Sequence, residues 1–209
     1  PGAERTRVQP HPLGVLGGVG VELDPDRRRD ESSAGERFDE LLRRGTDAER
    51  HLIDPIEAGT TPVVAMHHLG GWEWAAAWLT KGRGWPVASV AEWLEPPELF
   101  DWFLDFRRPL GMHIIPLGPS AAAEVAAQLA SGTIISLLCD RDISGDGIVV
   151  EFFGERTRLP GGPAVTALRG GAPLVPAAAY FEGGHCHSVI LPPIDTERRG
   201  KLRADVTRV

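Results

Sequence analysis

The 209-residue sequence predicts an α/β protein with a mainly parallel central sheet flanked by helices. Three observations lead to this prediction. Short apolar runs alternate with helical patterns from about residue 60 onwards, which is typical of βαβ units. The apolar runs are nearly continuous, as strands buried on both faces require. Glycines and prolines stand at the boundaries between segments, where helices begin and end.

The first part of this pattern reads as four strands connected by three helices. "TPVVAMHHL" and "TIISLLCD" are the first and last of these strands, and "SAAAEVAAQLASG" is the third helix, with Ser120 as its cap. Strands are expected at residues 61–69, 85–92, 112–118 and 133–140, and helices at 71–82, 96–111 and 120–132. Further strands are expected at 147–154, 172–183 and 187–195, and a helix at 162–171.

The chain is expected to divide into a polar N-terminal segment, residues 1–55, and one α/β domain, residues 56–209. The segment is rich in Pro, Gly, Arg and Asp and reads as partly irregular, with one short helix in "GERFDELLRRG".

Composition narrows the classes of function. The net charge of −7 argues against a nucleic-acid partner. It also argues against binding to anionic lipid by overall charge alone. Two cysteines make neither a disulfide framework nor a four-ligand zinc set, and favour a reducing compartment. The N-terminus lacks the apolar core of a signal peptide, and apolar runs fall short of the ~20 residues of a spanning helix. We therefore expect a protein that does not cross a membrane but can lie against one.

The stretch "DRDISGDGIVVE", from Asp140 to Glu151, has the oxygen-ligand spacing of an EF-hand calcium loop. The segments on both sides read as strands, whereas an EF-hand needs helices. A Gly-rich turn explains Ser144 and the residues after it. Asp140 and Asp142 instead follow a buried strand at its C-terminal end, where open α/β sheets bind their ligands.

The stretch "HHLGGWEW" places His68 at the tip of the first strand and Glu73 in the first turn of the next helix. The two glycines between them allow a tight turn, so the carboxylate can orient the imidazole as a general base. Two other interpretations stay open: His67 and His68 as partly buried strand residues, and a metal site. The metal site is weakened because adjacent strand residues point to opposite faces.

"HHLGGWEW" resembles the His-x4-acid motif of bacterial late acyltransferases. These comprise the lipid A acyltransferases and the actinobacterial phosphatidylinositol mannoside acyltransferases, within a wider glycerolphosphate-acyltransferase-like group. "VAEWLEPPELFDWFLDFRRPLGMHIIPLG", "LLCDRDISGDGIVVEFFGERTRLPGGPAVTALRGGAPLVP" and "ILPPID" resemble the same family in order and spacing. The resemblance covers roughly residues 60–196 and is strongest to the mannoside branch.

The resemblance implies a peripheral membrane O-acyltransferase on the cytoplasmic side of the plasma membrane, at the inner membrane surface. It would move a long acyl chain from acyl-CoA or acyl carrier protein to a hydroxyl of a glycolipid or phospholipid, such as a phosphatidylinositol mannoside. Acyl-CoA is then a co-substrate, and neither a cofactor nor a metal is expected. Members of the family continue with helices beyond the point that corresponds to "ILPPID", so this chain is interpreted as a fragment or a short, divergent member.

The resemblance also assigns roles to residues. His68 takes the place of the general base, Glu73 that of the orienting acid, and Asp140 that of an acid close to the histidine. The expected substrate-binding residues are Glu92 and Arg107 on the acceptor side, Arg141 facing phosphate groups, and Asp142. Without the family, surface ion pairing is the favoured explanation of the two arginines.

The acyl chain needs an apolar groove, and the aromatic-rich segment 96–106 offers one. Core packing and membrane contact are alternatives for these side chains. Two other functions remain open: a non-catalytic lipid-binding relative, and a calcium-binding protein that uses Asp140–Glu151.

Overall fold

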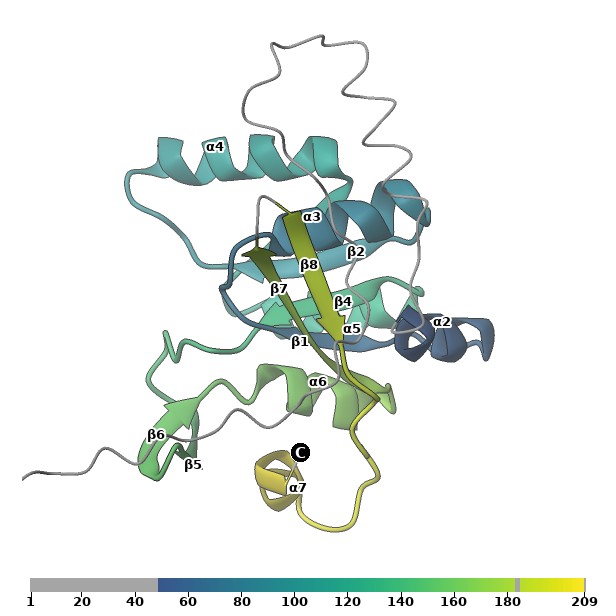
Figure 1. The fold of residues 1–209 in the computed structure, drawn as a ribbon. Coiled ribbons are helices and arrows are strands. Elements are labelled where there is room, and N and C mark those ends of the chain that lie inside the picture. Colours follow the sequence, from purple (N-terminus) through teal and green to yellow (C-terminus); the bar gives the residue numbers. More distant parts are fainter. Residues whose placement is uncertain (1–48, 183–184, 209) are drawn as a thin grey trace, which may run out of the picture.

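The computed structural model describes residues 49–182 and 185–208. Figure 1 shows a twisted central sheet with helices on both faces. The strands of this sheet are β1 (Val63–Met66), β2 (Val87–Ala91), β3 (Met112–Pro116), β4 (Ile134–Leu138), β7 (Leu174–Glu182) and β8 (His185–Ile190). Their spatial order is β3-β2-β4-β1-β7-β8. All neighbours pair in parallel except β8, which runs antiparallel to β7 at one edge. The predicted fold class is confirmed.

Two groups of helices cover the two faces of the sheet (Figure 1). One face carries α2 (Arg50–Glu57), α3 (Trp72–Ala77) and the π-helix η2 (Trp78–Gly82), with α4 (Pro97–Arg107) and the 3-10 turn η3 (Arg108–Leu110) alongside α3. The other face carries α5 (Ala121–Ala130), α6 (Gly162–Gly170) and α7 (Leu202–Arg208).

Each face has its own buried core. Alternate side chains of one strand enter different cores: Val87 packs on the α3 side and Ala88 on the α5 side. The same alternation separates Ile134 from Ile135 in β4. The strands are therefore buried on both sides, which explains their continuous apolar sequences.

Three elements were not expected from the sequence. The strand β6 (Glu155–Leu159) forms a hairpin with β5 (Ile148–Phe152), outside the main sheet. Its sequence, ERTRL, carries no apolar run because most of its side chains are exposed. The other two are α7 and α2. The helix α2 crosses the expected boundary at residue 55, and its Leu52 is buried in the core on the α3 side. The helix expected in "GERFDELLRRG" lies outside the described residues.

The turn between β1 and α3 depends on Gly71, which has a φ of 90°. A Cβ on Gly71 would lie 2.7 Å from Sγ of Cys186 in β8, so there is no room for a side chain. Gly132 has a similar φ of 87°, but nothing lies within 4 Å of a Cβ placed there. A substitution at Gly132 would therefore introduce backbone strain alone, whereas one at Gly71 would add a steric clash.

We expect Gly71→Ala to lower the free energy of unfolding by about 2–4 kcal/mol, because left-handed strain and overpacking both contribute. Gly132→Ala, the matched control, loses only the strain contribution of about 1 kcal/mol. Urea unfolding followed by circular dichroism measures both. Equal losses would show that the space beside Cys186 does not constrain this turn.

Candidate active site

The site begins with the register of two neighbouring strands. The strand β1 pairs with β4 so that Met66 lies opposite Leu138. Continuing both chains by two residues places His68 beside Asp140, at the C-terminal edge of the sheet. The backbone N–H of Cys139 donates to the carbonyl of Met66, so the alignment persists beyond the last strand pair.

His68 and Asp140 are joined by two hydrogen bonds. Nδ1 of His68 lies 2.7 Å from Oδ1 of Asp140, and the backbone N–H of His68 donates to Oδ2 over 3.1 Å. A carboxylate only accepts hydrogen bonds, so Nδ1 is the protonated nitrogen of the neutral ring. Nε2 then carries the free lone pair, and it has no hydrogen-bond partner among the residues that the structure describes. This is the arrangement that a general base requires.

The pKa of Asp140 reflects its surroundings. Burial alone would raise it, but the hydrogen bonds from the His68 ring and backbone outweigh burial and hold the pKa below its ordinary value. The carboxylate is therefore ionised at neutral pH and can stabilise a protonated imidazole. Next to it, burial and then the charge of Asp140 raise the pKa of the Cys139 thiol to about 11.

The hydrogen bond expected between Glu73 and His68 is not formed among the described residues. Glu73 lies in the first turn of α3 and accepts instead from Nη2 of Arg107 in α4, over 3.2 Å. The Arg107 guanidinium also lies 5.0 Å from the Trp72 ring centroid and 5.1 Å from that of Phe103. This ion pair ties α3 to α4. The carboxylate beside the imidazole is that of Asp140.

Glu92 and Arg141 form the third pair at this edge. Arg141 Nη2 lies 3.7 Å from Oε1 of Glu92, and the arginine side chain is 58% exposed. Such an exposed pair is held weakly, so Arg141 can exchange Glu92 for another anion. Both residues line the cleft described below.

Asp142 has a different place from the one expected. Its two carboxylate oxygens accept from the backbone N–H groups of Gly145 and Gly147, at 3.0 and 3.1 Å. It does not line the cleft, and its contacts hold the turn before β5. The EF-hand interpretation is wrong because the flanking elements β4 and β5 are strands, and because the carboxylate of Asp142 already binds backbone N–H groups. In the described part of the chain, no group of three His, Cys, Asp or Glu residues is arranged to hold a metal ion.

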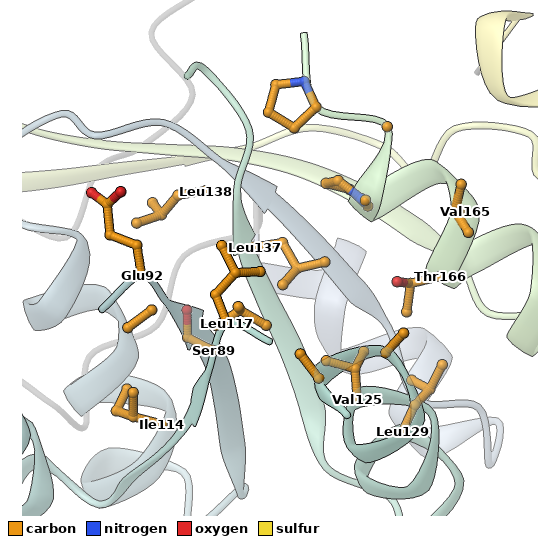
Figure 2. Close-up of a pocket in the computed structure, with 18 of the residues that line it drawn as sticks. Ser89, Glu92, Ile114, Leu117, Val125, Leu129, Leu137, Leu138, Val165 and Thr166 are labelled. Atoms are coloured by element: carbon orange, nitrogen blue, oxygen red, sulfur yellow. The ribbon is translucent and has the colours of Figure 1, made fainter. Parts of the chain in front are cut away.

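A cleft of about 1320 Å³ opens at this edge of the sheet. His68, Glu73, Glu92, Arg107 and Arg141 all line it. The remaining lining is largely apolar and extends to both faces of the sheet, because β2 and β4 contribute side chains of both orientations. Figure 2 shows Leu138 beside Glu92 with Ser89 and Ile114 below them, Leu137 near the centre, and Val125 and Leu129 on the opposite side.

An apolar part of the cleft lies between α5 and α6, and the sequence did not predict it. The sequence feature that could have predicted this groove is the alanine-rich helix 121–130, because small side chains leave space between neighbouring helices. The groove expected at residues 96–106 is not found: of its apolar side chains only Phe103 lines the cleft. Phe100 is buried, whereas Leu99, Trp102 and Phe106 are exposed. No helix in the described ranges is both long enough and apolar enough to span a bilayer.

Comparison with known proteins identifies the family of this chain. The model of a family described as bacterial lipid A biosynthesis acyltransferase matches residues 37–209. A phosphatidylinositol mannoside acyltransferase of Mycolicibacterium smegmatis is 39% identical over 149 residues, which cover 70% of this chain and 49% of that protein. One of Mycobacterium tuberculosis is 37% identical over 148 residues, covering 69% and 46%. The chain spans about half the length of these curated relatives.

The lowered pKa of Asp140 gives a pH dependence of stability. The ionised carboxylate stabilises the fold above its unfolded-state pKa of ~3.9, and this contribution disappears as pH falls through the lower folded-state value. We expect the difference in unfolding free energy between wild type and Asp140→Asn to be largest near neutral pH and to shrink below about pH 4.

Urea unfolding across a pH series measures this difference. Asp101→Asn, a change at an exposed carboxylate of α4, serves as the control. A difference for Asp140→Asn that does not change with pH would show that its carboxylate gains nothing from its contacts with His68.

Proposed function

Because the chain belongs to the bacterial lipid A biosynthesis acyltransferase family, we propose that it moves an acyl group from a thioester donor to a hydroxyl of a lipid. The relatives named phosphatidylinositol mannoside acyltransferase point to a mannoside glycolipid as the acceptor. The donor is acyl-CoA or acyl carrier protein. The observation that carries the proposal is the free Nε2 of His68 at the cleft, with Asp140 hydrogen-bonded to the opposite ring nitrogen.

The chemistry follows from this pair. Nε2 of His68 takes the proton of the acceptor hydroxyl while the hydroxyl oxygen attacks the carbonyl carbon of the thioester. The bond from this carbon to sulfur then breaks, and the sulfur leaves with the proton held by the imidazolium. The charge of Asp140 stabilises that imidazolium, which exists only between the two proton transfers.

The other expected residues have distinct parts in this proposal. Arg141 faces the cleft as an exposed cation for a phosphate of donor or acceptor, in exchange for its weak pair with Glu92. Glu92, freed from Arg141, accepts hydrogen bonds from acceptor hydroxyls. Glu73 and Arg107 fix the helix walls of the cleft instead of joining the proton transfer, since each already holds the other.

We expect His68→Ala to lower the rate of acyl transfer by about 10²–10⁴-fold, the usual contribution of a general base. His67→Ala is the matched control, because this neighbouring side chain is exposed and does not line the cleft. The assay follows transfer from a radiolabelled acyl-CoA to phosphatidylinositol mannoside.

The same assay distinguishes the two carboxylates. Asp140→Asn should lose turnover with little change in circular dichroism, because an amide no longer fixes the tautomer of His68. Full activity of His68→Ala would refute the mechanism. Acyl-CoA binding by wild type without any product would favour the non-catalytic lipid-binding relative.

We further propose that the protein works as a peripheral protein on the cytoplasmic side of the plasma membrane. Both cysteines are free thiols, as a reducing compartment favours. Leu99, Trp102 and Phe106 are exposed on α4 at spacings of three and four residues, which places them on one face of the helix. Trp102 and Phe106 stack with their centroids 6.0 Å apart. This face is suited to the apolar boundary of a lipid surface.

We expect Trp102→Ala with Phe106→Ala to weaken binding to phosphatidylcholine vesicles at least tenfold, since two aromatic side chains no longer enter the lipid. Vesicle co-sedimentation measures the partition coefficient. Phe153→Ala, at the exposed tip of the β5–β6 hairpin, is the control. Loss with Phe153→Ala alone would move the contact to the hairpin and contradict this assignment.

A further inference from the structure

The turn that leads from His68 into α3 consists of Leu69, Gly70 and Gly71. Its two glycines give the backbone more conformational freedom than other residues would. Leu69 and Gly70 make no backbone–backbone hydrogen bond with another residue of the described part of the chain. Packing by neighbouring elements is therefore what limits the motion of this turn, and with it the direction in which His68 leaves β1.

The side chains that pack on the turn come from the antiparallel strands β7 and β8. Figure 1 shows the end of β7 beside α3, and the two elements are in contact. Phe181 of β7 lies directly opposite Cys186 of β8 in the ladder. Directly opposed side chains of an antiparallel pair lie on the same face, so both face the turn together.

The phenyl ring of Phe181 lies against both glycines. A Cβ on Gly70 would lie 2.8 Å from Cδ2 of Phe181. A Cβ on Gly71 would lie 3.3 Å from Cζ of the same ring. The thiol of Cys186 packs on Gly71 alone, with its Sγ 3.7 Å from the carbonyl oxygen. The ring is thus the one side chain of this pair that spans the whole Gly-Gly step.

Two observations separate Phe181 from the core and from the cleft. Its side chain is 49% exposed, so it adds little to the buried core on this face of the sheet. No described residue of β7 or β8 lines the cleft, so the ring is not one of its walls. A contact with the turn is what remains to explain a large apolar side chain at this position.

We propose that Phe181 is a positioning residue for the general base. Its ring holds the Gly70–Gly71 turn in place, so that Nδ1 of His68 stays at Asp140 and Nε2 stays at the cleft. The inference rests on the proposed acyl transfer and adds a residue that acts on it through His68. A base must lie within hydrogen-bond reach of the proton it removes, and a displacement of about 1 Å can cost about 10²-fold in rate.

The first test compares Phe181→Ala with Tyr180→Ala in the acyl-transfer assay. Tyr180 is the matched control because it precedes Phe181 in β7, points to the opposite face and stacks on His187, with ring centroids 5.3 Å apart. We expect Phe181→Ala to lower kcat about 10–100-fold and to leave both KM values within about twofold. Tyr180→Ala should keep the wild-type kcat. A raised KM with an unchanged kcat would show that the ring binds substrate, which contradicts the proposal.

The second test reads the imidazole without turnover. Long-range nitrogen–proton correlation NMR spectra distinguish the two tautomers of a neutral histidine ring, and the signals absent from His68→Ala identify His68. The wild type should carry its proton on Nδ1, because Asp140 accepts there. Phe181→Ala should show a mixture of both tautomers, and Tyr180→Ala the wild-type pattern. An unchanged tautomer in Phe181→Ala would mean that the ring does not position the base.

The third test addresses the contact itself. Gly70 lacks the positive φ of Gly71, so the backbone accepts an alanine there and its cost arises from the Phe181 ring. Gly70→Ala should therefore lower kcat in the wild-type chain and add no further loss to Phe181→Ala, where the ring is absent. Additive losses would show that the new methyl group acts in the cleft, which Gly70 also lines, and would refute the coupling.

Circular dichroism checks that each variant folds. If Phe181→Ala does not fold, Phe181→Leu takes its place, because a smaller apolar side chain covers less of the turn and should give an intermediate loss of kcat. An active wild type whose Phe181 variants keep both kcat and tautomer overturns this inference and leaves the acyl transfer intact. If the wild type transfers no acyl group, the proposed function fails and the inference fails with it. A lower kcat, a mixed tautomer and no added loss from Gly70→Ala together support it.

Discussion

The parallel pairing of β1 with β4 is the constraint on which the site depends. The two strands are distant in the sequence, yet their register carries His68 and Asp140 to the same point of the sheet edge. A slip by one residue would reverse the faces of every side chain that follows. The cores on the two faces prevent such a slip, because Ile134 and Ile135 must each enter their own core. The geometry of the His68–Asp140 pair is thus secured by packing in the two cores.

Much of the fold was predictable because its signals are local. Continuous apolar runs and glycine or proline boundaries predicted the strands β1 to β4 and the helices between them. The helix α7 and the strand β6 escaped because polar residues such as Arg156 and Arg158 dominate their sequences. The hairpin of β5 and β6 is stabilised by pairing across its own turn, which leaves no pattern of burial to detect.

The sequence predicted which residues belong to the site better than it predicted which of them contact one another. The family motif drew attention to His68 and Glu73, which are five residues apart in the chain. Which carboxylate meets the imidazole depends on strand order, and order is a property of the whole sheet that no local pattern encodes. Asp142 shows the same limit: its residue type suits a ligand, but two backbone N–H groups already occupy it. The apolar part of the cleft between α5 and α6 depends on the rotation of two helices about their axes, which alanine-rich sequence leaves open.

The raised pKa of Cys139 has a chemical consequence for the proposed transfer from a thioester. Cys139 precedes Asp140 in the chain, does not line the cleft, and its thiol donates to the carbonyl of Met66 over 3.2 Å. A thiol with a pKa of about 11 is almost entirely protonated in a neutral cell, and the protonated form is a poor nucleophile. Burial is the main cause of this raised pKa, and the charge of Asp140 adds to it. In the proposed acyl transfer, both effects would keep the chain from acylating itself at this sulfur.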